Sequence, residues 1–300
     1  MFHGIDTHAL LERPWTRFWK VLRMAAIGTY NDNCLGIGKG AAYSSLLSFF
    51  PVLTTVAALL VDARAEDVSR AVASFLYEVV PPGTEDVVRD LFVVHGTRPR
   101  SVLVAAVLLS TWAASSALMS LMEGFRAIYH LPSGRSWIKE RGVAISLVFV
   151  AAAPMWGAAV LIVFGERILR ATLYWLRLFP RGADLGGPVV LTAQALRYGV
   201  AFTCVVLVTM LIYYIGPNRK QKFSTLFPGA ATATLLWMMS TAAFAWYVRH
   251  VANYNLLYGS VGAGLALLAW MYVLSVIMLF GCEINAAHEH IDAAAAAGKD

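Results

Sequence analysis

One long apolar run most constrains what this chain can fold into. It extends from Tyr258 to Cys282 and carries no charge until Glu283. At about 1.5 Å per helical residue, such a run crosses roughly 30 Å of hydrocarbon and is too long for an ordinary core helix. We therefore predict a membrane span, with small residues at its start and with Glu283 and Asn285 just after it.

The composition extends this prediction to the whole chain. Of its 300 residues, 59% are hydrophobic and 14% are charged, whereas about a quarter of the residues in soluble domains are charged. We expect an all-α, polytopic membrane protein with one membrane domain at residues 39–290. Its six predicted transmembrane helices lie at about residues 41–61, 102–122, 142–164, 193–215, 226–248 and 257–283.

Three segments outside the spans complete the expected organisation. Residues 13–30 place aromatic and basic side chains on opposite helical faces, which indicates an amphipathic helix that lies in the membrane interface or packs on the bundle. This helix belongs to an N-terminal region, residues 1–38, and we expect Asn31-Asp32-Asn33 and the glycines Gly36, Gly38 and Gly40 to separate it from the bundle. Residues 62–100 are too charged to span, and their periodicity predicts a helical hairpin outside the hydrocarbon. We expect a flexible, alanine-rich tail at residues 291–300.

Two of the predicted spans carry polar side chains on one helical face. Hydroxyls recur at helical spacing in the first span, and a tryptophan, two serines and a carboxylate recur in the second. Such faces indicate either close helix packing through small residues or the lining of a substrate cavity. Together with the carboxylate and amide after the sixth span, the candidate cavity residues are Ser44, Ser48, Pro51, Thr55, Trp112, Ser116, Ser120, Glu123, Glu283 and Asn285.

The two carboxylates of this set allow more than one interpretation. Glu123 precedes Arg126 by three residues, so an ion pair along the same helix is the structural interpretation. A carboxylate on a polar intramembrane face is also a candidate for ion-coupled transport. The sequence contains no Walker A loop, no Gly-x-Gly-x-x-Gly motif and no metal-binding cysteine cluster. We therefore expect no cofactor, no metal and no catalytic residue, so that any transport is passive or driven by an ion gradient.

Basic residues in short loops predict the orientation. With six spans and the N-terminus inside, the cytoplasmic side collects the basic N-terminal helix, the loop at 126–141 and the cationic loop at 216–222. The positive-inside rule favours this arrangement, with both termini cytoplasmic. The formal net charge of +6 is thereby explained by topology and lipid headgroups rather than by a nucleic-acid partner.

Three parts of the chain carry a recognisable pattern: residues 42–51, residues 216–220 with residues 227–230, and residues 258–285. Together they resemble the YihY/BrkB family of bacterial membrane proteins, and their order and spacing cover most of the chain. The resemblance implies a six-span protein of the bacterial inner membrane, and some family members carry a serum-resistance or virulence-factor label. The chain has Gly124-Phe125-Arg126 where the family pattern after the second span is Ala-Leu-Asn, so no role is carried over to Arg126.

We expect a transporter or a lipid- or amphiphile-handling protein that is not an enzyme. Its expected partners are membrane lipids and an anionic or amphipathic small molecule, while oligomerisation stays open. The alternative is a non-transporting envelope scaffold associated with virulence. The family also carries a former ribonuclease label, which the sequence does not support because it contains neither a soluble nuclease domain nor an acid or histidine cluster that would hold catalytic metals.

Overall fold

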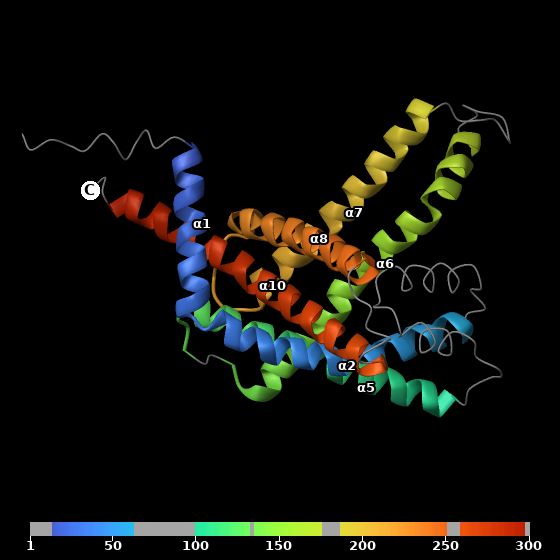
Figure 1. Cartoon of the computed structure of the whole chain (residues 1–300), viewed down its shortest axis with the longest axis horizontal. Coiled ribbons are helices and arrows are strands. Elements are labelled where there is room, and N and C mark those ends of the chain that lie inside the picture. The colour runs from blue at the N-terminus through green and yellow to red at the C-terminus, as the bar shows by residue number, and fades with distance from the viewer. Residues whose placement is uncertain (1–13, 63–99, 133–134, 176–186, 251–258, 298–300) are drawn as a thin grey trace, which may run out of the picture.

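The computed structural model describes residues 14–62, 100–132, 135–175, 187–250 and 259–297. These residues are helical apart from short turns, as expected for an all-α chain (Figure 1). The predicted hairpin at 62–100 lies outside them, except for its two end residues. The elements, in order, are α1 (Pro14–Asn31), α2 (Cys34–Asp62), α5 (Arg100–Ile128), α6 (Trp137–Trp175), α7 (Gly187–Ile215), η2 (Phe223–Leu226), α8 (Phe227–His250) and α10 (Gly259–Ala297).

A helix occupies the position of each predicted span. Among the described residues, three stretches are long and apolar enough to cross a membrane: Val104–Ile128, Gln194–Ile215 and Gly264–Ala297. Large apolar side chains point outward from their helices and from α8, as a hydrocarbon environment requires, and they include Leu108, Leu109, Leu196, Leu207, Met238, Met239 and Leu265. The structure thus supports a membrane bundle, while the number of six spans stays a prediction.

Helix α10 runs through the middle of the bundle, between α2 and α8 (Figure 1). It also packs against α1 and α5. The largest buried cluster joins its residues Leu279 and Cys282 to Phe125 of α5 and to Tyr213 of α7. The apolar run that predicts a membrane span is therefore also the central packing element of the fold.

Helices α8 and α10 cross at two glycines that approach each other closely. A Cβ atom added to Gly229 would overlap the backbone carbonyl oxygen of Gly281. A Cβ atom added to Gly281 would lie 2.7 Å from the carbonyl oxygen of Gly229 and would also overlap the hydroxyl of Tyr213. Only glycine allows this crossing, because the backbones of the two helices are in direct contact there.

The N-terminal region differs from the expected boundaries. We expected glycines 36, 38 and 40 to separate the first helix from the bundle, but α2 begins at Cys34 and contains all three. The reason is tertiary packing: a Cβ atom at Gly38 would touch Val276 of α10, so this glycine permits a close contact instead of ending a helix. At the other end of the chain, residues 291–297 of the expected tail form the last turns of α10.

Helix α1 lies across one end of the bundle and crosses the C-terminal half of α10 (Figure 1). Its buried Val21 and Ala25 pack on Ile284 and Ala287 of α10. The aromatic side chains of α1 stay exposed and form a mutually contacting cluster of Trp15, Phe18 and Trp19, with ring centroids 5.7–6.1 Å apart. The structure therefore shows the packing of this helix on the bundle, while its position in the membrane interface stays a prediction.

Candidate functional site

The hydroxyl face of α2 packs against α5. The hydroxyl of Thr55 donates to the carbonyl of Pro51 at 2.8 Å and lies 3.2 Å from the hydroxyl of Ser110. Ser48 is buried and donates to the carbonyl of Ser45. Ser44 is half-buried one turn before Ser48. These contacts are those of helix packing, and a cavity lined by this face stays a prediction.

The polar face of α5 is engaged by an arginine from α6. The guanidinium of Arg141 donates to the hydroxyls of Ser115 and Ser116 at 3.0 and 2.9 Å, and it lies 4.0 Å from the ring centroid of Trp112. Ser120, one turn further, donates to the carbonyl of Ser116. Trp112 and the two serines therefore form a cation site that Arg141 of the same chain fills.

The carboxylate of Glu123 lies apart from that of Glu283. Glu123 is exposed, and the structure does not bear out the ion pair that we considered between it and Arg126. Arg126 pairs with Glu140 of α6 instead, and both of these side chains are largely buried. A partner on a neighbouring helix competes successfully here because burial strengthens an ion pair that the surface would weaken.

Glu283 lines a pocket of about 390 Å³ between α1, α10 and the end of α5. We call this the acidic pocket, and its polar lining residues are Asn31, Asp32, His130, Glu283 and His290. The buried carboxylate of Glu283 accepts a hydrogen bond from the thiol of Cys34 at 3.5 Å. Burial, followed by the charge of Glu283, raises the pKa of the Cys34 thiol, so this group stays a neutral donor. Among the described residues, no group of three or more metal-ligating side chains is arranged to hold an ion.

A second pocket, of about 560 Å³, lies on another side of α10 and contains Asn285. We call this the basic pocket. It is lined from α1, from the end of α5, from the loop between α7 and α8, and from α10 by Arg17, Tyr129, Arg219, Gln221, Lys222, Ser224, Thr225, Leu226, Pro228, Asn285, His288, Glu289 and Asp292. Its volume is within the range of small-molecule sites, about 300–1,000 Å³.

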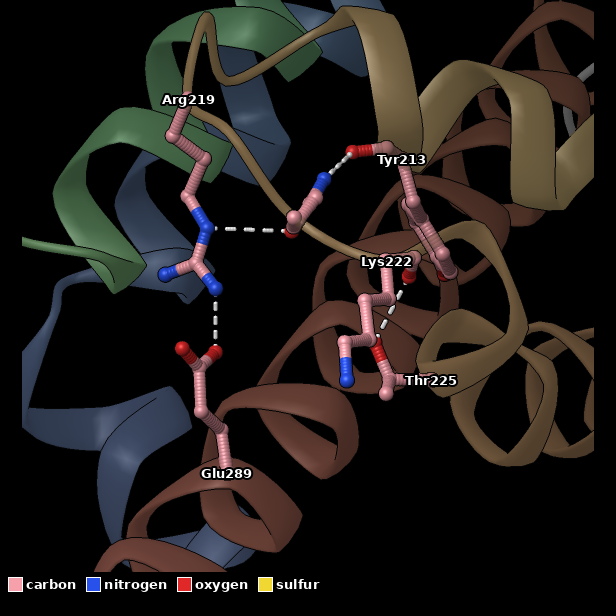
Figure 2. A network of polar contacts seen from close by, with 6 residues as sticks. Tyr213, Arg219, Lys222, Thr225 and Glu289 are labelled. Carbon is pink, nitrogen blue, oxygen red and sulfur yellow. Dashed lines mark hydrogen bonds and ion pairs between the residues drawn. The ribbon is translucent and has the colours of Figure 1, made fainter.

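The loop between α7 and α8 is tied back to the bundle so that its cations face this pocket. Gln221 donates to the carbonyl of Tyr213 at 2.7 Å and accepts a hydrogen bond from Nε of Arg219 at 3.0 Å. Figure 2 shows Arg219 reaching across to Glu289 of α10, with which it forms an ion pair. The guanidinium of Arg219 also lies 3.9 Å from the ring centroid of Tyr129. The position of Arg219 is therefore fixed from three sides.

Asn285 lines the basic pocket and carries an unused hydrogen-bond donor. Its side-chain oxygen accepts a hydrogen bond from the backbone N–H of Gly229 at 2.8 Å, which fixes the orientation of the amide. Its amide nitrogen is buried and has no hydrogen-bond partner. A buried donor without a partner costs roughly 1–3 kcal/mol, so a ligand that accepts from it recovers that free energy.

Of the ten candidate residues, the two pockets take in only Glu283 and Asn285, and they lie on different sides of α10. Sequence reasoning missed the role of Asp32 and Cys34 beside Glu283, because it treated the turn near residue 32 only as a break. It also missed that Asn285, Glu289 and Asp292 share one face of α10. Their spacing of four and three residues was a usable signal for that face.

An all-helical bundle with apolar side chains on its outside and charged pockets at one end defines a helical membrane protein. The chain belongs to the virulence factor BrkB family, whose model matches residues 27–300. This finding confirms the family resemblance that the sequence segments carry.

Two of the three relatives described here are named as membrane proteins, and the third is named as a ribonuclease-like protein. The protein named ribonuclease-like protein YfkH of Bacillus subtilis is 29% identical over 82% of this chain and 86% of its own length. A UPF0761 membrane protein of Tolumonas auensis is 26% identical over 91% of this chain and 82% of its own. A UPF0761 membrane protein of Prosthecochloris aestuarii is 25% identical over 84% of this chain, which spans only 57% of that relative. No solved structure matches the chain.

Proposed function

We propose that this protein handles lipids or other anionic amphiphiles in the bacterial inner membrane, as a transporter or lipid-binding protein and not as an enzyme. The observation that carries the proposal is the basic pocket, in which Arg17, Arg219 and Lys222 converge from two separate parts of the chain. Cations at the membrane surface attract anionic headgroups, at about 1 kcal/mol for each Lys or Arg.

The position of the pocket supports a cytoplasmic orientation of both ends of the chain. The pocket lies where α1, the loop between α7 and α8 and the C-terminal half of α10 meet. Helix α1 and this loop each carry three basic residues, and the positive-inside rule assigns such an end to the cytoplasm. The exposed aromatic cluster of α1 lies on the same helix as Arg17, as suits a helix in the interface of the anionic leaflet.

Neutralising two cations of the basic pocket is expected to weaken the binding of anionic lipids. We expect the double substitution Arg219→Gln and Lys222→Gln to weaken phosphatidylglycerol binding roughly 30-fold, because about 1 kcal/mol is lost for each cation. Titration of the delipidated full-length protein in uncharged detergent, followed by native mass spectrometry, measures this affinity. The control is Lys220→Gln, which removes an exposed charge from the same loop at a residue that does not line the pocket.

The same titration decides against the proposal if the wild-type protein binds phosphatidylglycerol no better than phosphatidylcholine. Handling beyond binding is tested in reconstituted vesicles, where the protein should accelerate the movement of a fluorescent anionic lipid between leaflets relative to protein-free vesicles. Binding without such movement would favour a lipid-binding protein over a transporter.

A non-transporting envelope scaffold is the second candidate. The exposed cluster of Trp15, Phe18 and Trp19 favours it, because aromatic side chains are the usual anchors of protein interfaces. The scaffold hypothesis predicts that replacing these three aromatic residues has the same effect on the cell as deleting the protein, whereas the substitutions in the basic pocket have no effect.

A further inference from the structure

We propose that the basic pocket selects a phosphomonoester group, and that Glu289 and Asp292 compete with this ligand for the pocket arginines. This inference rests on the proposed function and deepens it by naming the chemical class of the headgroup. The shared chemistry is a terminal phosphate, whether it belongs to a lipid such as phosphatidic acid or is free inorganic phosphate.

The first argument is the number of cations and donors that face the pocket. Two arginines and Lys222 come from α1 and from the loop before α8, and Asn285 of α10, whose buried amide nitrogen has no partner, lines the same pocket. A phosphomonoester offers three terminal oxygens and close to two negative charges, whereas a phosphodiester offers two oxygens and one charge. The monoester therefore uses more of the donors that this pocket supplies.

The second argument is the solvent exposure of the two ion pairs in the pocket. The side chain of Arg219 is 20% exposed, whereas that of its partner Glu289 is 57% exposed. The pair between Arg17 and Asp292, at 2.5 Å, is open to solvent on both sides. Exposed ion pairs contribute little free energy, so either carboxylate can turn into water at small cost. Arg219 cannot follow, because Gln221 and the ring of Tyr129 hold it.

The third argument is the direction of helix α8. This helix begins at Phe227, beside the lining residues Leu226 and Pro228, so its N-terminal end faces the pocket. The N-terminus of a helix carries partial positive charge and favours phosphate. The side-chain oxygen of Asn285 accepts a hydrogen bond from the backbone N–H of Gly229 in that first turn. The unpartnered nitrogen belongs to the same amide group and therefore lies close to the start of α8.

Removing the competing carboxylate tests the inference directly. We expect Glu289→Gln to tighten phosphatidic acid binding about fivefold, because phosphate no longer displaces a carboxylate from Arg219, which corresponds to the roughly 1 kcal/mol of an exposed pair. We expect Asn285→Asp to weaken it about tenfold, because a donor is replaced by an acceptor that repels the ligand. The matched control Glu123→Gln removes an exposed carboxylate that does not line the pocket and should leave the affinity unchanged.

The ligands in this experiment are phosphatidic acid, phosphatidylglycerol and phosphatidylcholine in uncharged detergent micelles, with inorganic phosphate as a competitor. The wild-type protein should bind phosphatidic acid more tightly than phosphatidylglycerol. Displacement by inorganic phosphate would identify the free ion as a ligand, and its failure would identify the lipid form.

Equal affinity for phosphatidic acid and phosphatidylglycerol, both above phosphatidylcholine, would overturn this inference while the proposed function stands. Equal affinity for all three lipids would overturn both. If Asn285→Asp does not fold, Glu289→Gln still decides the matter, since its carboxylate is exposed and its replacement leaves the core untouched. An unchanged affinity in Glu289→Gln would contradict the competition.

Discussion

Alanine in place of Gly229 is expected to destabilise the protein by about 3 kcal/mol, the upper part of the range for overpacked cores. The added methyl group would overlap the carbonyl oxygen of Gly281, and backbone atoms cannot turn aside as a flexible side chain can. Helices α8 and α10 must then separate, which disturbs the buried cluster around Leu279. The measurement is the thermal unfolding midpoint of the purified protein in detergent, which should fall by roughly 5–10 °C.

Gly264 supplies the control for this prediction. It lies on α10 as well, and a Cβ atom added there meets no other atom within 4 Å. Gly264→Ala should leave the midpoint unchanged or raise it slightly, because alanine is favoured over glycine in a helix by roughly 1 kcal/mol. Equal effects of the two substitutions would show that the close crossing does not determine stability.

Removing the carboxylate of Glu140 is expected to cost about 3–5 kcal/mol, because Arg126 then keeps a largely buried charge without a partner. Glu140 also lies in the first turn of α6, where the helix dipole favours a negative side chain. Thermal unfolding of Glu140→Ala, in the same detergent, measures the loss.

Two further variants distinguish the cost of the unpaired buried charge from the cost of lost side-chain packing. Arg126→Met combined with Glu140→Leu should recover much of the stability, since apolar pairs often replace buried ion pairs at no cost. Asp292→Ala breaks the exposed pair with Arg17 and should change the stability by less than about 1 kcal/mol. A double variant as unstable as Glu140→Ala alone would contradict the role given to the unpaired charge.

The sequence predicts helices well in this chain because apolar runs of membrane length leave few alternatives. In the part of the chain that the structure describes, a helix occupies the position of each expected span, and the apolar run forms the central helix α10 from Gly259 onward. The glycines near residue 38 mislead, since a glycine that ends a helix and one that permits a close helix contact look alike in sequence. Only the packing partner, here Val276 of α10, distinguishes them.

The site is less predictable, because its residues meet only through tertiary packing. Helical periodicity groups Ser116 with Trp112, but it does not reveal that Arg141, 25 residues further on, contacts both. The basic loop is visible as charge, yet its approach to Glu289 depends on the tie between Gln221 and Tyr213. The sequence identifies Asn285 as an amide just after a span. That its nitrogen has no hydrogen-bond partner is known only from the structure, in which the N–H of Gly229 binds the amide oxygen and sets the orientation of the group.

The glycine crossing also decides which wall of the basic pocket is rigid. Gly281 lies one helical turn before Asn285, and Gly229 supplies the N–H that orients the Asn285 amide. This wall therefore cannot yield unless α8 and α10 part. Helix α1 contributes Arg17 to the pocket, packs on α10 through Val21 and Ala25, and pairs with it through Arg17 and Asp292. The two sides of the pocket therefore differ, because the crossing of α8 and α10 fixes the Asn285 amide, whereas the ion pair that holds the Arg17 guanidinium is open to solvent.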